Sequence, residues 1–310
     1  MTHLPGRNAP ALVQEKDVNG VLNDTSALPG IRMPIKITSP EVMLFSEYIY
    51  SICGIHIEAC KSYLLETRLG KLLESENCRS FSEFYRRIRN DANNCMQNKV
   101  IDAITTNETF FFRDSTPFEL LKFKILPEVI DRSAKLHAPP LPIRIWSAAC
   151  STGQEVYSIA MIIKELLGDL SKYCIKLLGT DLSDAAIKKA SYGAYNSFEI
   201  ERGLSRDRLQ CNFETFGSCW KIKSEIRSMV HFSKLNLMQS FSSLGKFDII
   251  FCRNVAIYFK LEDRKKLFDR IGENLERDGF LVVGATESLT GICPQFIPKC
   301  HLNSIFYQLR

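Results

Sequence analysis

Hydrophobic residues in the first third of the chain recur at the three- and four-residue spacing of amphipathic helices. One such group comprises Val42, Phe45, Ile49 and Ile52, and others lie at 64–73 and 81–88. Ser39 and Ser80 are each followed by an early glutamate, a combination that predicts helix starts. We expect a small all-α domain over residues 39–112, with its first helix ending at Gly54.

The pattern changes to alternating strands and helices from residue 143 onward. Expected strands are 143–147, 174–179, 247–251 and 280–284, and expected helices are 154–167, 184–191 and 261–275. This alternation predicts an α/β fold in which a mostly parallel, Rossmann-like sheet is covered by helices on both faces. The sheet domain is expected to span 143–310.

Three segments interrupt or connect these regular parts. Short strand-like pieces at 210–215, 219–224 and 229–232 predict a small antiparallel β-subdomain inserted at about 205–233. A helix through 122–126, followed by Pro139, Pro140 and Pro142, predicts a linker helix and a proline-rich connector over 113–142. Residues 1–38 lack periodicity, and we expect a disordered lead-in there.

Composition narrows the class of protein. The chain of 310 residues is 45% hydrophobic and 24% charged, with no apolar run near the roughly 20 residues of a membrane span. Eleven cysteines without paired CxxC spacing, and no signal pattern at the start, predict free thiols in the cytoplasm. A net charge of +5 is modest, so nucleic acid is not expected as the partner.

Candidate ligand residues follow the predicted parallel strands, where open α/β sheets bind their ligands. Small residues at 147–153 allow the backbone to approach a ligand, and Glu155 then either faces the ligand or favours the helix dipole. Asp181, after the second strand, is placed to accept hydrogen bonds from ribose hydroxyls. The alternative, a cap for the next helix, suits Ser183 better.

Two further segments carry polar residues toward the same edge. Asn236 could read an adenine edge while Leu237 packs on the ring, although asparagine is also common in turns. Arg253 and Asn254 end an apolar strand and make sense if they line a cleft, which Tyr258 would face. Without GxGxxG or GxxxxGK[ST], the leading ligand is S-adenosylmethionine, which contains adenosine but no phosphate.

An aromatic run ending in an arginine precedes the sheet domain. For at least two of Phe110, Phe111 and Phe112 we expect packing between the two domains. Such packing does not account for Arg113, whose position suggests a small anionic substrate.

These residues, taken in order, resemble the chemotaxis receptor methyltransferases (CheR family), which methylate receptor glutamates with S-adenosylmethionine. The resemblance covers about 39–310. The segments that carry it are 105–113 (TTNETFFFR), 146–155 (WSAACSTGQE), 179–183 (GTDLS), Asn236–Leu237 and 251–259 (FCRNVAIYF). Together they are far more specific than any one of them.

The resemblance implies a site, a reaction and a partner. The residues expected around the cofactor are Asn107, Thr109, Arg113, Glu155, Asp181, Asn236, Leu237, Arg253 and Asn254. Arg113 and Tyr258 would flank the reacting methyl, with S-adenosylhomocysteine as product and no metal. The acceptor glutamate, with a reference pKa of about 4.3, is already ionised at neutral pH, so placement rather than a general base is required. The substrate would be the cytoplasmic helical region of membrane chemoreceptors, methylated by a monomer.

Some features depart from the family or leave alternatives open. The family docks on receptors through basic residues, and here Lys61, Arg68 and Lys71 are interspersed with glutamates. The hairpin at 213–220 is short, so we expect no dependence on a tethered receptor tail. A nucleic-acid base methyltransferase would need [DN]PP[YF] where the chain has CRNV at 252–255. A non-catalytic module that senses S-adenosylmethionine is the alternative, against which Arg113 and Tyr258 argue.

Overall fold

The computed structural model describes residues 35–301 and 303–310. Most of the expected disordered lead-in, residues 1–34, lies outside the described part. Residues 35–38 are described, and the backbone N–H of Ile37 donates to the Glu66 carboxylate at 3.0 Å. Within the described ranges, none of the helices combines the length and hydrophobicity that crossing a membrane requires.

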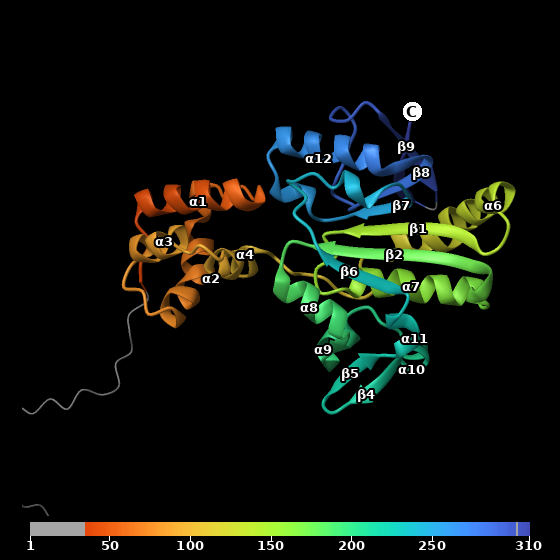
Figure 1. Cartoon of the computed structure of the whole chain (residues 1–310), viewed down its shortest axis with the longest axis horizontal. Helices are drawn as coiled ribbons and strands as arrows, with labels where there is room; N and C mark the ends of the chain where they lie inside the picture. The colour runs from red at the N-terminus through yellow and green to blue at the C-terminus, as the bar shows by residue number, and fades with distance from the viewer. Residues whose placement is uncertain (1–34, 302) are drawn as a thin grey trace, which may run out of the picture. The chain divides into compact units, whose positions relative to one another are not determined.

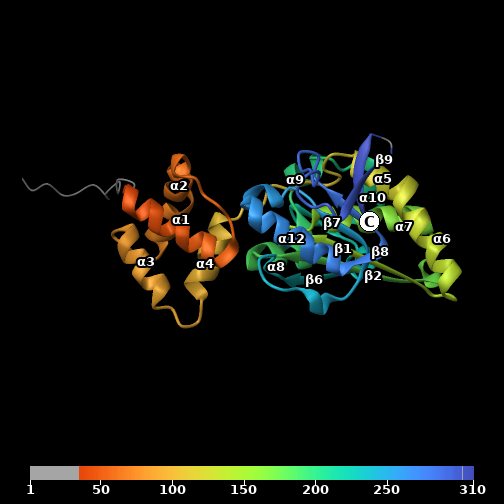
Figure 2. The ribbon, with the colours of Figure 1, turned by 90° about the horizontal axis from the view of Figure 1, so that it is seen from above.

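The first part of the chain is helical, as predicted (Figures 1 and 2). Its helices are α1 (Ser39–Cys53), α2 (Ser62–Ser75), α3 (Phe81–Arg89) and α4 (Cys95–Ile104). The Ser80 hydroxyl accepts from the Glu83 N–H at 3.1 Å and caps α3. Gly54 ends α1 with φ +73°, a left-handed conformation that glycine adopts at low cost. The predicted start of α3 and the end of α1 are therefore confirmed, whereas at the start of α1 the N-cap is Thr38 rather than Ser39.

A continuous helical segment connects this part to the sheet. It comprises α5 (Thr116–Leu120), a π-helical turn (Leu121–Ile125) and α6 (Leu126–Leu136). The predicted helix through 122–126 is thus confirmed, although it is much longer than the pattern indicated. Strand β1 starts at Leu141 and includes Pro142, two residues before the predicted start.

A seven-stranded sheet forms the centre of the rest, in the order β6-β2-β1-β7-β8-β10-β9. Its strands are β1 (Leu141–Ala148), β2 (Tyr173–Asp181), β6 (Val230–Lys234), β7 (Phe247–Cys252), β8 (Leu275–Val283), β9 (Phe296–His301) and β10 (Ser304–Leu309). The first five in this spatial order are parallel, and β10 runs antiparallel to β8 and β9. The order reverses direction between β1 and β7, which is where such sheets bind ligands. The β9–β10 hairpin was not predicted.

Helices cover both faces of this sheet, as expected (Figure 2). Alternate strand residues separate into two cores, with Ile145 and Ile249 on the side of α7 (Gln154–Leu167). Trp146 and Ile250, one position further along each strand, pack on the side of α12 (Leu261–Asn274). Helix α8 (Asp184–Tyr192) lies beside β2 and β6. This two-sided burial explains the nearly continuous apolar runs in the sequence.

A separate three-stranded antiparallel sheet is inserted between β2 and β6, which confirms the predicted subdomain in kind. It comprises β3 (Ala194–Tyr195), β4 (Phe213–Phe216) and β5 (Cys219–Ile222), with α9 (Ser197–Glu201), α10 (Arg206–Asn212) and α11 (Ser224–Arg227). The assignment of 229–232 to it was wrong, because Val230–Lys234 pairs in parallel with β2. This edge strand is only partly buried, so its alternation resembles that of a hairpin strand. Residues 210–212 belong to α10, not to a strand.

Candidate active site

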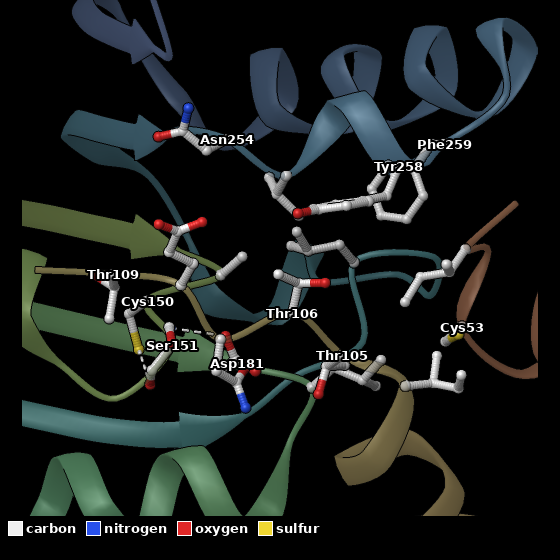
Figure 3. Close-up of a pocket in the computed structure, with 18 of the residues that line it drawn as sticks. Cys53, Thr105, Thr106, Thr109, Cys150, Ser151, Asp181, Asn254, Tyr258 and Phe259 are labelled. Carbon is white, nitrogen blue, oxygen red and sulfur yellow. Dashed lines mark hydrogen bonds between the residues drawn. The ribbon is translucent and has the colours of Figure 1, made fainter. Parts of the chain in front are cut away.

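A pocket of about 310 Å³ opens at the carboxyl ends of β1, β2 and β7. Residues from the helical part also line it, among them Cys53, Ile57 and Arg68. The structure brings all of the predicted site residues to this pocket: Asn107, Thr109, Arg113, Glu155, Asp181, Asn236, Leu237, Arg253, Asn254 and Tyr258. Figure 3 shows Thr109, Asp181, Asn254 and Tyr258 around the same space. Their individual roles remain predictions.

The loop after β1 folds tightly enough to bring backbone atoms to the pocket. Ala149, Ser151 and Gly153 have φ values of +60°, +51° and +95°. A Cβ at Gly153 would lie 2.9 Å from the Cβ of Ala190 on α8, so only glycine fits there without a shift. Helix α7 begins at the next residue, Gln154. The positive φ values and the glycine at 153 thus define the backbone conformation of the loop that was expected to approach a ligand closely.

Asp181, the last residue of β2, is buried with 7% of its surface exposed. Its two carboxylate oxygens accept from the N–H groups of Ser151 at 2.8 Å and Ser183 at 2.9 Å (Figure 3 draws the first). Burial raises the pKa of this carboxyl, and the backbone N–H donors offset part of the effect. Ser183 is the residue that caps α8, through the N–H of Ala186. Asp181 therefore keeps lone pairs for a ligand.

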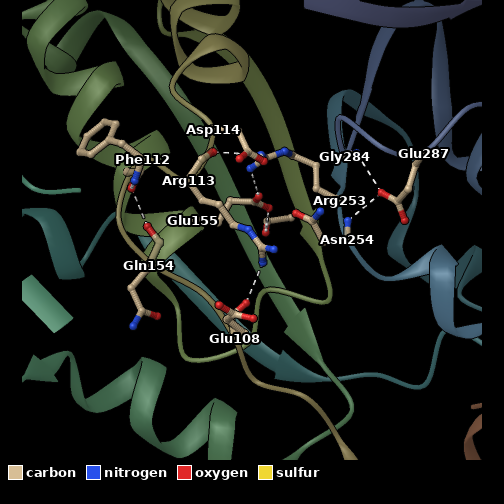
Figure 4. A network of polar contacts seen from close by, with 12 residues as sticks. Glu108, Phe112, Arg113, Asp114, Gln154, Glu155, Arg253, Asn254, Gly284 and Glu287 are labelled. Atoms are coloured by element: carbon tan, nitrogen blue, oxygen red, sulfur yellow. Dashed lines mark hydrogen bonds and ion pairs between the residues drawn. The ribbon is translucent and has the colours of Figure 1, made fainter. Parts of the chain in front are cut away.

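Arg253 organises the charged side of the pocket (Figure 4). Only 5% of its surface is exposed, and its guanidinium donates to Glu155 Oε2, Asp114 Oδ2 and the carbonyl oxygen of Arg113, each at 2.9 Å. Glu155 also accepts from Ser147 Oγ at 2.8 Å. Glu155 thus lines the pocket and pairs with a buried cation, in addition to lying at the positive end of α7. The part played by Asp114 was not predicted.

Arg113 is held between two residues in the left-handed region, Phe112 at φ +53° and Asp114 at φ +55°. Such conformations are costly for residues other than glycine and persist where surrounding contacts enforce them. The Phe112 N–H donates to Ser158 Oγ at 3.0 Å, and Arg253 binds the other side of the segment. The Arg113 guanidinium donates to the Glu108 carbonyl oxygen at 2.8 Å. Arg113 also lines the pocket, and a guanidinium carries further N–H donors besides the one used here.

The aromatic run corrects one expectation. Phe111 and Phe112 are buried in the core of the sheet domain rather than between the two domains. Phe111 meets the rings of Tyr195 and Phe213 at centroid distances of 5.1 and 5.5 Å, edge to face. The sequence showed three apolar residues but not their partners, which lie about a hundred residues further along the chain.

Asn236 and Leu237 also reach the pocket, although the amide of Asn236 is already engaged. Its Nδ2 donates to the carbonyl oxygen of Ile52 at the end of α1, and its Oδ1 accepts from the N–H of Met238, both at 2.9 Å. Leu237 is buried, with 6% exposed. The turn role that was weighed as an alternative is therefore real, and a contact with adenine stays a prediction.

The segment after β7 carries Asn254 and Tyr258. Asn254 has φ +57°, and Tyr258 ends a short 3₁₀ turn (Ala256–Tyr258), with its side chain pointing into the pocket (Figure 3). The carbonyl oxygen of Tyr258 accepts from the N–H of His56 at 3.0 Å. Glu287 binds the start of this turn and was not predicted. It follows shortly after a parallel strand, β8, but nothing in the sequence indicated its backbone partners.

The chemistry of the pocket fits an adenosine-containing cation. Among the described residues, Ser151 Oγ and Arg253 Nε are buried without a hydrogen-bond partner, and both residues line the pocket. Such groups normally need a partner, which a polar ligand provides. Asp181 can accept two hydroxyl groups, and the Glu155 carboxylate favours positive charge. Cys150 also lines the pocket, with 2% exposed, and burial raises the pKa of its thiol well above the usual range.

The sheet order, the pocket at its switch point and the acidic residue after β2 define an S-adenosylmethionine-dependent methyltransferase. Residues 107–302 match the family model described as "CheR methyltransferase, SAM binding domain". Residues 40–105 match "CheR methyltransferase, all-alpha domain". The chain therefore belongs to the CheR methyltransferase family, which confirms the resemblance seen in the sequence.

Curated relatives agree with this assignment. The chain is 44% identical over 253 residues to chemotaxis protein methyltransferase Cher2 of Pseudomonas putida, covering 80% of this chain and 90% of the relative. It is 42% identical over 254 residues to chemotaxis protein methyltransferase 1 of Pseudomonas aeruginosa, with coverage of 80% and 90%. It is 39% identical over 285 residues to the chemotaxis protein methyltransferase of Vibrio parahaemolyticus, with coverage of 89% and 99%.

Proposed function

We propose that this chain methylates glutamate side chains of membrane chemoreceptors, producing glutamate methyl esters and S-adenosylhomocysteine. The observation that carries the proposal is the convergence of Arg113 and Tyr258 on the pocket that also contains Asp181 and Glu155. One pair suits an anionic acceptor and the other suits the cofactor. The names of the relatives place them in chemotaxis, and chemoreceptors are the substrates that this pathway offers.

S-adenosylmethionine, when bound, supplies an electrophilic methyl group on a positively charged sulfonium. Asp181 accepts the ribose hydroxyls through the lone pairs that Ser151 and Ser183 leave free. Glu155 places negative charge near the amino-acid end of the ligand, where Asn107 and Thr109 also line the pocket. Leu237 provides an apolar surface for the adenine. No metal is required by this arrangement.

The acceptor needs orientation and removal of water rather than deprotonation, because a glutamate is ionised at neutral pH. The Arg113 guanidinium has five N–H donors and uses one for the Glu108 carbonyl oxygen. The others bind the acceptor carboxylate with charge-assisted hydrogen bonds. The phenol of Tyr258 donates from the opposite segment and fixes the direction of attack. Closure of the pocket around the acceptor replaces its hydration shell.

The basic residues at the start of α2 and along it bear on the proposed receptor contact, and some of them are engaged within the protein. Lys61 pairs with Glu58 at 3.4 Å, and Arg68 donates to the carbonyl oxygen of Ile104 and to Thr106. Lys71 has no ion pair among the described residues. We propose docking on the receptor's cytoplasmic helical region, close to the pocket that α2 helps to line, by a monomer in the cytoplasm.

The small β-sheet bears on how the enzyme reaches its receptor. Strands β4 and β5 are joined by only two residues, Gly217 and Ser218. We propose that this short turn does not hold a carboxyl-terminal receptor peptide, so methylation proceeds on receptors that lack one. Deleting the last residues of a receptor in the host should then leave its rate of methylation unchanged.

Transfer of a labelled methyl group from S-adenosylmethionine to host membranes tests the reaction. Label that mild alkali releases as methanol, on a membrane protein, supports a glutamate ester. Label that resists alkali contradicts the choice of acceptor. Binding of S-adenosylhomocysteine by calorimetry without any transfer would instead favour the non-catalytic module. Arg113→Ala serves as the inactive comparison.

A further inference from the structure

The carboxylate of Glu287 accepts hydrogen bonds from four backbone N–H groups on two segments of the chain. Its Oε2 binds the N–H of Asn254 at 2.7 Å and of Gly284 at 2.8 Å. Its Oε1 binds the N–H of Ala256 at 2.9 Å and of Val255 at 3.1 Å. Figure 4 shows the bonds to Asn254 and Gly284. Glu287 itself is 9% exposed, so these bonds are shielded from water.

The segment that Glu287 binds is the one that carries Tyr258. Asn254, Val255 and Ala256 present consecutive N–H groups at the start of the 3₁₀ turn Ala256–Tyr258. Such groups have no partner within the turn itself, and a carboxylate is the strongest acceptor for them. Asn254 is left-handed at φ +57°, a conformation that needs external support in a residue other than glycine.

Gly284 makes the arrangement sterically specific. A Cβ at this position would lie 2.7 Å from Glu287 Oε2 and 2.9 Å from Asn254 Nδ2. The end of β8 and the start of the turn can therefore share one carboxylate only because residue 284 has no side chain. A larger residue in place of Gly284 therefore displaces the Glu287 carboxylate without removing its charge.

We infer that Glu287 is a positioning residue for methyl transfer, because it fixes the turn that directs Tyr258 into the pocket. Glu287 is not among the residues that line the pocket. It acts through the backbone of residues 254–256. The inference rests on the proposed function of Tyr258.

A double-mutant cycle of Glu287→Gln and Tyr258→Phe tests it. A glutamine cannot accept all four N–H groups, since its NH₂ group faces donors. We expect Glu287→Gln to lower the transfer rate at saturating S-adenosylmethionine by roughly 10- to 100-fold. The double variant should be no slower than the slower single variant, because a misplaced phenol and a missing phenol have the same effect. Binding of S-adenosylhomocysteine, measured by calorimetry, should change less than the rate.

Glu276→Gln is the matched control. Glu276 lies at the other end of β8, pairs with Arg144, and has 37% of its side chain exposed. Its replacement should leave the transfer rate unchanged. If Glu287→Gln does not fold, Gly284→Ala displaces the same carboxylate and should show the same non-additivity with Tyr258→Phe.

Each result separates this inference from the function on which it rests. A wild-type rate in Glu287→Gln overturns the inference, as does a cycle in which the two effects multiply, while a slow Tyr258→Phe variant still supports the proposed function. A wild-type rate in Tyr258→Phe overturns the role of the phenol and the inference together.

Discussion

The buried guanidinium of Arg253 donates a hydrogen bond to the backbone carbonyl oxygen of Arg113 at 2.9 Å. One arginine thus holds the main chain of another, and its other donors bind the carboxylates of Asp114 and Glu155. The main chain of Arg113, which is proposed to bind the acceptor, is therefore held by Arg253, which was predicted only to contact the cofactor. Arg253 also lines the pocket, and its buried Nε has no hydrogen-bond partner among the described residues.

Replacing Arg253 by lysine should destabilise the protein and reduce activity. A lysine keeps the charge but loses the planar fork, and it cannot reach all three acceptors. We expect the free energy of unfolding in urea to fall by about 2 kcal/mol. Arg144→Lys alters a half-exposed pair with Glu276 and should cost less than about 1 kcal/mol. Equal losses of unfolding free energy in Arg253→Lys and Arg144→Lys would contradict the view that burial makes the Arg253 contacts more important for stability.

Removal of the Arg113 side chain should slow methyl transfer by at least about 100-fold. Its charge is proposed to act on the acceptor, so cofactor affinity should fall much less than the rate. Arg202→Ala is a suitable comparison. The guanidinium carbons of Arg113 and Arg202 both lie over the Phe110 ring, at 5.7 and 4.8 Å from its centroid, but Arg202 does not line the pocket. Full activity of Arg113→Ala in a methyl-transfer assay would refute the role of this guanidinium.

Cofactor affinity should decrease on acidification because of Asp181. Burial raises the pKa of this carboxyl, so the folded protein binds a proton there more readily than the unfolded chain does, and the stability that this protonation contributes is lost as pH rises through the raised value. Ribose binding requires the ionised form, so affinity for S-adenosylhomocysteine rises over the same range. Calorimetry from about pH 7 down to about pH 5 should show weakening in the wild type. The Asp181→Ser variant should bind S-adenosylhomocysteine weakly and with an affinity that does not depend on pH. The same pH profile in the wild type and the variant would exclude Asp181 as the cause.

Gly153→Ala should be more harmful than Gly217→Ala, although both residues have positive φ. At Gly153 the new Cβ would meet Ala190 at 2.9 Å, whereas at Gly217 nothing lies within 4 Å. We expect losses of about 3 kcal/mol and about 1 kcal/mol in the free energy of unfolding. Only Gly153→Ala should also weaken cofactor binding, since it distorts the loop that carries Ser151. Similar effects at both sites would show that backbone strain alone decides.

Much of the fold was predictable because buried apolar residues recur at regular intervals along helices and strands. Helix α7 was predicted at its observed bounds of 154–167, and β1, β2 and β7 were placed within about two residues, whereas β8 begins well before its predicted start at 280. Segment 229–232 was misassigned because the alternation of apolar and polar residues shows only that one face of a strand is more exposed. It does not show with which strand the segment pairs. The C-terminal hairpin was missed because β9 is mostly exposed.

The site was predictable where residues follow parallel strands, and less so where contacts join distant segments. Asp181 and Arg253 are examples of the first kind, since strand ends meet at one edge of the sheet. Glu287 belongs to the second kind, because its four backbone partners leave no pattern in side-chain identity. The hydrogen bond from the Asn236 amide to the carbonyl oxygen of Ile52 in α1 was equally unpredictable from the sequence.

The burial of Cys150 bears on the safety of the enzyme toward its own cofactor. A thiolate attacks electrophilic carbon far more readily than a carboxylate does, and Cys150 lines the pocket that is proposed to receive S-adenosylmethionine. Burial and the nearby charges of Asp181 and Glu155 raise the pKa of this thiol well above its usual range. The sulfur therefore stays protonated and unreactive at neutral pH. Burial is thus the main cause that keeps this thiol in its unreactive form, and the two carboxylates add to the effect.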